Sequence, residues 1–256
     1  MRFSSLGSGS KGNGLLVEAG ETTILLDCGF GLTECRNRLA RLGKSPESLS
    51  AIVVTHEHAD HMGGVARLAK RYAIPVYLTY GSYSAAASQF EGCSVNWIMS
   101  DSPVAVNDLQ LLPYAVPHDA REPVQFVFSD GSYRLGVLTD TGSITAHICE
   151  HLTACDALVL ECNHDLEMLR AGRYPVSLKR RVSGAHGHLD NQTAASLLQR
   201  IDSSRLQHVV AAHLSQENNR RELAVMALAT ALGCAEEWIG VAEQEEGLGW
   251  RELKSA

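Results

Sequence analysis

Four potential metal ligands directly follow a short apolar run, and this arrangement constrains the chain more than any other feature. The run is residues 51–54, Ala-Ile-Val-Val, and the ligands are His56, His58, Asp60 and His61. A short β-branched run of this kind predicts a buried strand. Because side chains two positions apart point the same way on an extended chain, His56 and His58 can converge on one ion. A turn after them can carry Asp60 and His61 to a second ion.

The residue types in this cluster suit a catalytic divalent metal. Imidazole nitrogens and carboxylate oxygens are ligands for first-row metals, and an unfilled coordination position leaves room for a reactive water. A single histidine at a strand end is usually explained by a structural hydrogen bond. Four ligands within six positions are much harder to explain in that way, so the cluster indicates a metal centre.

The composition is that of an ordinary globular protein. The chain has 256 residues, 45% of them hydrophobic and 20% charged, which is enough for one large core or two merged halves. No apolar run approaches the roughly 18 residues needed to cross a bilayer, and the N-terminus lacks an apolar signal segment. Seven cysteines without a C-x-x-C pair suit small buried side chains in a reducing compartment. We therefore expect a cytoplasmic protein with no membrane partner; the oligomeric state stays open.

The charge of the chain bears on its partners. A net charge of −7 argues against a surface coated with basic residues for non-specific binding of nucleic acid. Five of the 22 basic residues nevertheless lie within the twelve positions 170–181. This stretch, which includes Arg180, is either a local basic groove or an ordinary solvated face.

The hydrophobic pattern predicts an α/β protein in which strands and helices alternate after a strand-rich start. Strands are expected at residues 3–6, 15–18, 23–27, 51–55, 76–79, 95–99, 104–106, 109–116, 125–128, 133–138, 157–161 and 207–212, with a final strand at 238–241. Helices are expected at residues 32–42, 65–72, 82–89, 144–152, 193–201 and 219–232. The glycine-rich residues 7–14 lack the order of a phosphate-binding loop, so we interpret them as a flexible loop at the rim of the site. No low-complexity linker divides the chain, which predicts one domain, residues 1–256, of two similar halves with mixed sheets.

Four further side chains lie just beyond the carboxyl ends of predicted strands or at the start of a helix. They are His118, Asp140, His188 and His213. Ligands of open α/β proteins gather at such edges. Each of the four is weak evidence alone. Together with the cluster at 56–61 they provide five imidazoles and two carboxylates for two metal ions, with His188 left over.

The signature Thr-His-x-His-x-Asp-His at residues 55–61 resembles that of the metallo-β-lactamase superfamily. Further segments match the order of its YycJ/WalJ-like branch along nearly the whole chain: residues 7–14, 26–29, 118–120, 139–142, 161–165, 174–175, 187–189 and 213–215. The resemblance implies a four-layer αββα sandwich of two mixed β-sheets flanked by helices. It also implies a DNA exonuclease, close to the phosphodiesterase and tRNA-processing members of the superfamily.

The resemblance further implies two divalent metal ions held by seven side chains. The family's ligands of the first ion correspond to His56, His58 and His118. Those of the second ion correspond to Asp60, His61 and His213, and the carboxylate that bridges both ions corresponds to Asp140. Because position 140 is Asp rather than Cys, Mn becomes a rival to Zn. His188 matches a histidine that contacts the scissile phosphate. Asp27 matches a supporting acid of the family, and Asn13, His164 and Arg180 are further candidates for a supporting or substrate contact.

The expected reaction is hydrolysis of a phosphodiester bond, in nucleic acid or a smaller substrate. Two cations about 3.5–4 Å apart can bind a bridging hydroxide and lower the pKa of that water toward 7. Asp60 would orient the nucleophile, and His188 would protonate the leaving alkoxide or hold a phosphate oxygen. One alternative is an acyl hydrolase of the same fold, with a thioester, lactone or β-lactam substrate. Another is a metal-binding regulatory protein without turnover.

Overall fold

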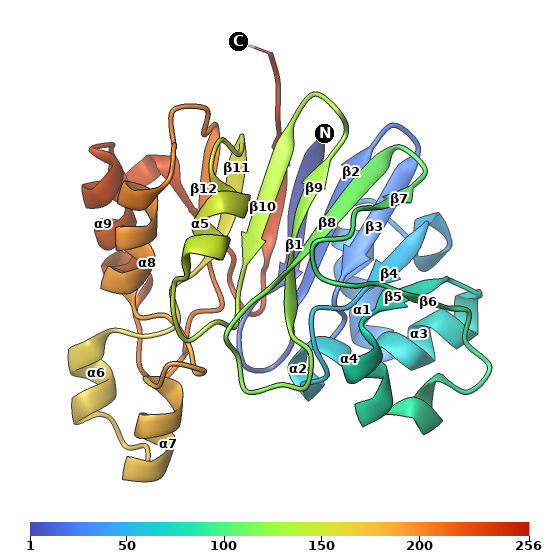
Figure 1. Ribbon diagram of the computed structural model, residues 1–256, viewed down its shortest axis with the longest axis horizontal. Coiled ribbons are helices and arrows are strands. Elements are labelled where there is room, and N and C mark those ends of the chain that lie inside the picture. Colours follow the sequence, from blue (N-terminus) through green and yellow to red (C-terminus); the bar gives the residue numbers. More distant parts are fainter. Residues whose placement is uncertain (256) are drawn as a thin grey trace.

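The computed structural model describes residues 1–255 and contains two mixed β-sheets of seven strands each, packed face to face (Figure 1). Its strands are β1 (Arg2–Gly7), β2 (Gly14–Ala19), β3 (Thr22–Leu26), β4 (Ala51–Val53), β5 (Val76–Leu78), β6 (Val95–Trp97), β7 (Val104–Val106), β8 (Leu109–Ala115), β9 (Val124–Ser129), β10 (Arg134–Leu138), β11 (Ala157–Glu161), β12 (His208–Ala212), β13 (Ile239–Val241) and β14 (Leu248–Glu252). The first sheet has the order β14-β1-β2-β3-β4-β5-β6, and the second has the order β13-β12-β11-β10-β9-β8-β7.

Helices cover the outer faces of both sheets (Figure 1). They are α1 (Leu32–Arg41), α2 (Ala59–Met62), α3 (Val65–Tyr72), α4 (Tyr80–Ala85), α5 (Ala146–Leu152), α6 (Leu166–Ala171), α7 (Val176–Val182), α8 (Asn191–Arg200) and α9 (Arg221–Leu232), with short 3₁₀ turns η1 (Pro46–Ser48), η2 (Ala87–Phe90) and η3 (Glu236–Trp238). Helices α1 and α3 pack on the first sheet, and α5, α8 and α9 pack on the second. The expected four-layer αββα sandwich is therefore confirmed. Within residues 1–255, every helix is too short or too polar to span a bilayer.

Three separate hydrophobic cores fill the three interfaces between the four layers. Strand β11 shows how one strand serves two of them. Ala157 and Val159 face the other sheet, whereas Leu158 and Leu160 face the helices. Alternation of this kind follows from the two-residue period of a strand. Since burying a leucine side chain stabilises the fold by about 1.5–3 kcal/mol, both faces of each central strand contribute to stability.

Each sheet combines antiparallel strands with a parallel set. Strands β3, β4, β5 and β6 are parallel in the first sheet. Strands β10, β11, β12 and β13 are parallel in the second. This repetition agrees with the two similar halves expected from the sequence. Parallel strands end at a common edge, so the residues that follow them are brought together there.

Two expected elements differ from the structure. The expected final strand at 238–241 is followed by another, β14, which pairs with β1 in antiparallel fashion. This strand depends on a partner at the other end of the sequence, which local patterning does not reveal. The expected helix at 82–89 is divided into α4 and η2, because Ala86 between them has a φ of −141° and leaves the helical region.

Candidate metal centre

The side chains singled out in the sequence meet at the edge where the parallel strands of both sheets end. Asp27 follows β3, Asp140 lies just after β10, and His213 directly follows β12. These three residues have positive φ values of 60°, 49° and 55°. Left-handed backbone is uncommon for residues other than glycine, and where it persists at several neighbouring positions it often marks a functional site.

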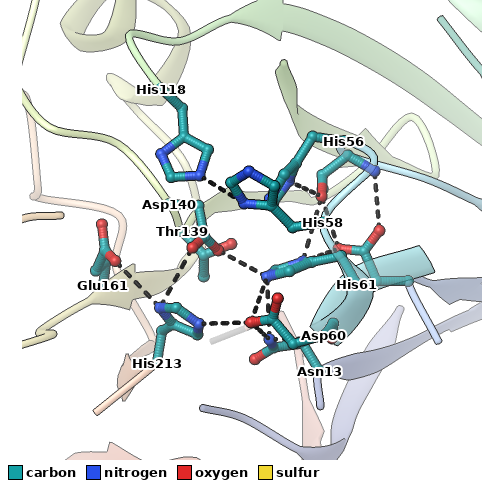
Figure 2. A network of polar contacts seen from close by, with 12 residues as sticks. Asn13, His56, His58, Asp60, His61, His118, Thr139, Asp140, Glu161 and His213 are labelled. Carbon is teal, nitrogen blue, oxygen red and sulfur yellow. Dashed lines mark hydrogen bonds and ion pairs between the residues drawn. The ribbon is translucent and has the colours of Figure 1, made fainter. Parts of the chain in front are cut away.

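His56, His58 and His118 form the first group of converging ligand atoms, all within 4.8 Å of one another (Figure 2). Nε2 of His118 lies 3.2 Å from Nδ1 of His58. The other ring nitrogen of His118 lies 3.1 Å from the backbone oxygen of Gly187, which directs Nε2 into the site. Nδ1 of His56 lies 2.9 Å from Oγ1 of Thr55, whereas its Nε2 is buried with no hydrogen-bond partner among the described residues.

Asp60, His61 and His213 form the second group, again with ligand atoms within 4.8 Å (Figure 2). Oδ2 of Asp60 lies 3.6 Å from Nε2 of both histidines. Nδ1 of His61 is 2.8 Å from Oδ2 of Asp27, which leaves Nε2 of His61 directed toward the site. This Nε2 lies 2.9 Å from Oδ2 of Asp140.

Asp140 lies between the two groups. It converges with His56 and His61 as well as with His188 and His213. Its Oδ1 is 3.5 Å from Nδ1 of His213 and 3.4 Å from Nδ1 of His188. Burial raises the pKa of Asp140, but His213 and His61 outweigh this effect and hold the pKa well below its usual range. The carboxylate is therefore charged and in the position that a ligand shared by two ions would need.

The chemistry of this donor set fits divalent cations. Nε2 of His56 and Nε2 of His213 are buried and make no hydrogen bond in the described part of the chain, and the buried Oδ2 of Asp140 has the ring nitrogen of His61, itself a candidate ligand, 2.9 Å away. Buried polar atoms without a partner are destabilising, and coordination to a cation would satisfy both nitrogens. Burial lowers the pKa of His56 well below its usual value, so this imidazole is neutral, as a metal ligand must be.

The imidazoles of the second group differ from His56, because they lie beside carboxylates and hold a proton until a cation displaces it. Burial lowers the pKa of His213, but the Asp140 carboxylate outweighs it and raises that pKa to about 10. The same carboxylate, together with Asp27, raises the pKa of His61 well above its usual value against the effect of burial. Several buried carboxylates thus concentrate negative charge at one point, which a divalent cation would neutralise.

Asp27 supports the site from behind. Its Oδ1 accepts a hydrogen bond from the backbone N–H of Thr55 and its Oδ2 accepts one from Oγ1 of Thr55, both at 2.8 Å. Oδ2 also lies against His61. A buried carboxylate held by two donors in this way fixes the orientation of the imidazole. Asp27 thus contacts the candidate ligand His61, and its supporting role stays a prediction.

The glycine-rich residues 7–14 form a packed wall of the site, not the flexible rim loop that the sequence analysis expected. The backbone N–H of Asn13 donates to the backbone oxygen of Asp60 at 2.8 Å, and Nδ2 of Asn13 lies 3.0 Å from Nε2 of His61. Ser8 Oγ accepts from the backbone N–H of His213 at 2.9 Å. The loop is ordered by long-range hydrogen bonds, which the run of small residues does not reveal.

Glu161 is a further candidate for the site, and the sequence alone did not single it out. This fully buried carboxylate lies at the end of β11, with Oε1 2.8 Å from Nδ1 of His188 and 3.2 Å from Nδ1 of His213. Its Oε2 accepts from the backbone N–H groups of Thr141 and Leu189. Burial raises the pKa of Glu161, but His188 outweighs this and the pKa falls to about 2. An acidic residue ending a central buried strand was the available signal.

The remaining candidates, His164 and Arg180, do not belong to the groups of converging ligand atoms. His164 is buried, neither of its ring nitrogens has a hydrogen-bond partner within residues 1–255, and its backbone oxygen accepts from Asn191. The basic stretch folds into α6 and α7, two helices that are not among those expected from the sequence. Arg180 on α7 makes no side-chain hydrogen bond or ion pair in the described structure. Its neighbour Arg181 instead donates to Oδ2 of Asp119 at 2.5 Å, next to His118.

Comparisons with known proteins agree with this architecture. The family described as the beta-lactamase superfamily domain matches residues 22–213. Exodeoxyribonuclease YycJ of Bacillus anthracis is 36% identical over 251 residues, 96% of this chain and 94% of the relative. Exodeoxyribonuclease WalJ of Streptococcus pneumoniae serotype 2 is 31% identical over 245 residues, 94% of this chain and 91% of the relative.

A solved structure supports the fold assignment. The metallo-beta-lactamase fold protein YhfI from Bacillus subtilis superposes with a TM-score of 0.75 at 16% sequence identity, covering 98% of this chain and 99% of that chain. At this identity the likeness concerns the fold alone. The shared fold, the family match and the two similar relatives all agree with the signature at residues 55–61. The chain therefore belongs to the YycJ/WalJ-like branch of the metallo-β-lactamase superfamily, and it is a metal-dependent hydrolase.

Proposed function

We propose that this chain is a binuclear phosphodiesterase that degrades DNA as an exonuclease. The main observation behind the proposal is the contact between His188 and Glu161 beside Asp140. Nδ1 of His188 lies 2.8 Å from Oε1 of Glu161. In a site already rich in metal ligands, this pair adds a group that can transfer a proton. The names of the two similar relatives, both exodeoxyribonucleases, support DNA as the substrate.

Seven side chains would hold the two ions, which are Zn or Mn. They are His56, His58 and His118 for the first ion, Asp60, His61 and His213 for the second, and Asp140 for both. The support is the convergence of these ligand atoms and the absence of a hydrogen-bond partner for Nε2 of His56 and Nε2 of His213 within the described residues. When bound, two such ions supply a water of lowered pKa and neutralise charge on the phosphate.

The protein side chains around the ligands would position the substrate and move a proton. Nδ1 of His188 donates to Glu161, which leaves Nε2 to protonate the leaving oxygen or to hold a phosphate oxygen. His188 is 21% exposed on its side chain, so a substrate can reach it. Asp60 lies between His61 and His213 and would orient the attacking water.

Basic residues near this edge favour a phosphate substrate over an acyl substrate. Lys179, Arg180 and Arg181 occupy the last turn of α7, and Arg181 is joined to Asp119 beside the first ligand group. Positive charge there would attract the backbone of a nucleic acid despite the net charge of −7. The acyl hydrolase alternative provides no role for this charge or for the His188–Glu161 pair.

Parallel assays with several substrates test the proposal. The metal-loaded protein is incubated with single-stranded DNA, double-stranded DNA, RNA, bis-p-nitrophenyl phosphate and nitrocefin. We expect mononucleotides to be released from DNA and the nitrophenyl diester to be cleaved, with nitrocefin left intact. Turnover of nitrocefin or a thioester without any cleavage of phosphodiesters would overturn the proposal in favour of the acyl hydrolase.

The proposal also covers the domain organisation and the cellular location of the enzyme. We infer one domain over residues 1–256 and a cytoplasmic location. All seven cysteines are free thiols in the structure, which agrees with a reducing compartment.

A further inference from the structure

A second group of potential metal ligands lies outside the candidate metal centre. It consists of Asp101, in the loop between β6 and β7, and of His147 and His151 on α5, and their ligand atoms all lie within 4.8 Å of one another. Nε2 of His147 is 3.2 Å from Oδ1 of Asp101, and Nε2 of His151 is 3.0 Å from the same oxygen. The proposed reaction uses none of these three residues, so the trio needs an explanation of its own.

The two histidines of the trio lie on one face of a helix. They are four positions apart on α5, and residues at this spacing are neighbours on a helix surface. Two histidines at this spacing are a recurring way for a helix to hold zinc. Four ligands about 2.0–2.1 Å from a zinc ion, at tetrahedral angles, lie about 3.3 Å from one another. The two nitrogen-to-oxygen distances in the trio, 3.2 and 3.0 Å, are close to this value.

Hydrogen bonds and ring stacking hold two of these ligands in place. Ser100 Oγ donates to Oδ2 of Asp101 at 2.8 Å and accepts from the backbone N–H of Ala115 at 2.9 Å, which leaves Oδ1 of Asp101 for the histidines. The ring of His151 stacks on the fully buried Tyr114, with ring centres 4.9 Å apart and planes at 12°. Supporting contacts of this kind orient metal ligands. The Ser100 hydrogen bond also lowers the pKa of Asp101 below its usual value, so the carboxylate is charged at neutral pH.

We propose that Asp101, His147 and His151 form a third metal site, which binds one Zn²⁺ ion from solution. Two imidazole nitrogens and one carboxylate oxygen match a three-residue ligand set that is common for zinc, and they favour Zn²⁺ over Mn²⁺ or Mg²⁺. Water would supply the fourth ligand, because the side chains of the three residues are 53%, 38% and 14% exposed. An ion at the trio therefore exchanges with solvent, in contrast to ions in the buried centre.

The position of the trio gives the ion a structural effect. The loop that carries Asp101 connects β6 of the first sheet to β7 of the second. Helix α5 lies on the outer face of the second sheet and packs against β8 (Figure 1). A zinc ion would fasten this crossing loop to that helix, and a ligand that binds only the folded state stabilises it. With three partly exposed ligands, we expect a dissociation constant on the order of 1 μM, so that dialysis leaves only the ions of the buried centre.

Competition with a zinc-binding dye of micromolar affinity tests the proposal. The protein is loaded with Zn²⁺, dialysed against metal-free buffer and then titrated with Zn²⁺ alone. We expect wild type to take up one further equivalent. His147→Ala and Asp101→Asn should each weaken this uptake by at least about 10-fold, the loss that follows even when a supporting partner of a ligand is removed. His208→Ala is the matched control, because His208 on β12 belongs to none of the groups of converging ligand atoms in residues 1–255.

Thermal unfolding gives a second readout. Zinc at 100 times its dissociation constant should raise the Tm of dialysed wild type on the order of 5 °C and leave that of His147→Ala unchanged. Loss of the third equivalent in His147→Ala would support the site even if wild type cleaved no DNA; that second result would overturn only the proposed function.

Two results would overturn the third site. One is the absence of a third equivalent in wild type below about 100 μM zinc. The other is equal uptake by His147→Ala and His208→Ala, which would place the ion elsewhere. In either case the trio would be a hydrogen-bonded cluster that holds no ion.

Discussion

At the scale of single residues, the site depends on Glu161, which contacts two histidines from different segments. Its Oε1 lies 2.8 Å from His188 and 3.2 Å from His213. The carboxylate therefore couples the proposed proton donor to a proposed metal ligand. Supporting carboxylates of this kind fix the tautomer and orientation of an imidazole.

We predict that Glu161→Gln lowers the rate of DNA cleavage by about 10- to 100-fold. The loss should be smaller on a p-nitrophenyl ester, because nitrophenolate leaves without needing a proton. His188→Ala should lose on the order of 10²–10⁴-fold on DNA with metal content unchanged. The double variant should be no slower than His188→Ala alone, since the two residues act as a unit. Additive losses would contradict this coupling.

The cysteines give a second prediction at this scale. Burial raises the pKa of Cys155 to about 11, so at pH 8 this thiol is almost entirely protonated and unreactive. Cys28, Cys35 and Cys162 are also buried. We expect no more than three thiols, the half-buried Cys93, Cys149 and Cys234, to react with a thiol-specific disulfide reagent in the native protein. All seven should react in guanidinium. Rapid reaction of more than three in the native state would be inconsistent with the packing.

At the scale of elements, the segment after β3 packs against the turn that carries Asp60. A Cβ on Gly29 would lie 1.9 Å from the backbone oxygen of Asp60, which is far inside contact distance. The backbone of α2 would have to move. The site thus depends on a close approach between two main chains, which only glycine allows here.

We predict that Gly29→Ala displaces Asp60 and lowers both metal content and activity, with a loss of stability on the order of 1–3 kcal/mol. Gly31→Ala is the matched control. A Cβ at Gly31 meets nothing within 4 Å, and its φ of −62° suits alanine. The control should leave activity intact and stabilise the protein slightly, by about 0.4–1 kcal/mol. Urea unfolding and elemental analysis of both variants test this; equal effects at the two positions would refute the steric argument.

At the scale of the whole molecule, the proposed ions would join the two halves. His56, His58, Asp60 and His61 belong to the half that builds the first sheet, whereas Asp140 and His213 follow strands of the second. A ligand that binds only the folded state stabilises it by mass action. When the ions are removed, the buried carboxylates would be balanced only by the protons that His61 and His213 then hold.

We predict two equivalents of Zn or Mn per chain, and a fall in Tm on the order of 10 °C after chelation, reversed by adding either metal. Elemental analysis and thermal unfolding measure these effects. A separate trio, the exposed Asp101 with the half-buried His147 and His151, could also hold an ion, so His147→Ala serves as a control that should keep both equivalents. Asp140→Ala should lose metal and show no further change on chelation. A Tm that is insensitive to chelation in wild type would contradict the proposed centre.

The ligand candidates could be predicted from the sequence because their signal is local. His56, His58, Asp60 and His61 lie within six positions, and the others lie one or two positions beyond apolar runs that are predicted as buried strands. Strands with both faces buried read as continuous apolar segments, which makes their ends visible in the sequence. The same regularity made the α/β class predictable, whereas the four layers were expected from the resemblance to the superfamily.

Only the tertiary structure decided which other side chains meet the site. Glu161 reaches His188 and His213 across intervals of 27 and 52 positions, and Arg181 rather than Arg180 points to Asp119. Strand β14 pairs with β1 across nearly the whole chain. Such contacts depend on strand order and helix rotation, which are set by the packing of all layers together. The neighbours of a residue along the chain reveal the hydrophobic period of its helix or strand. Its neighbours in space depend on the free-energy minimum of the whole fold.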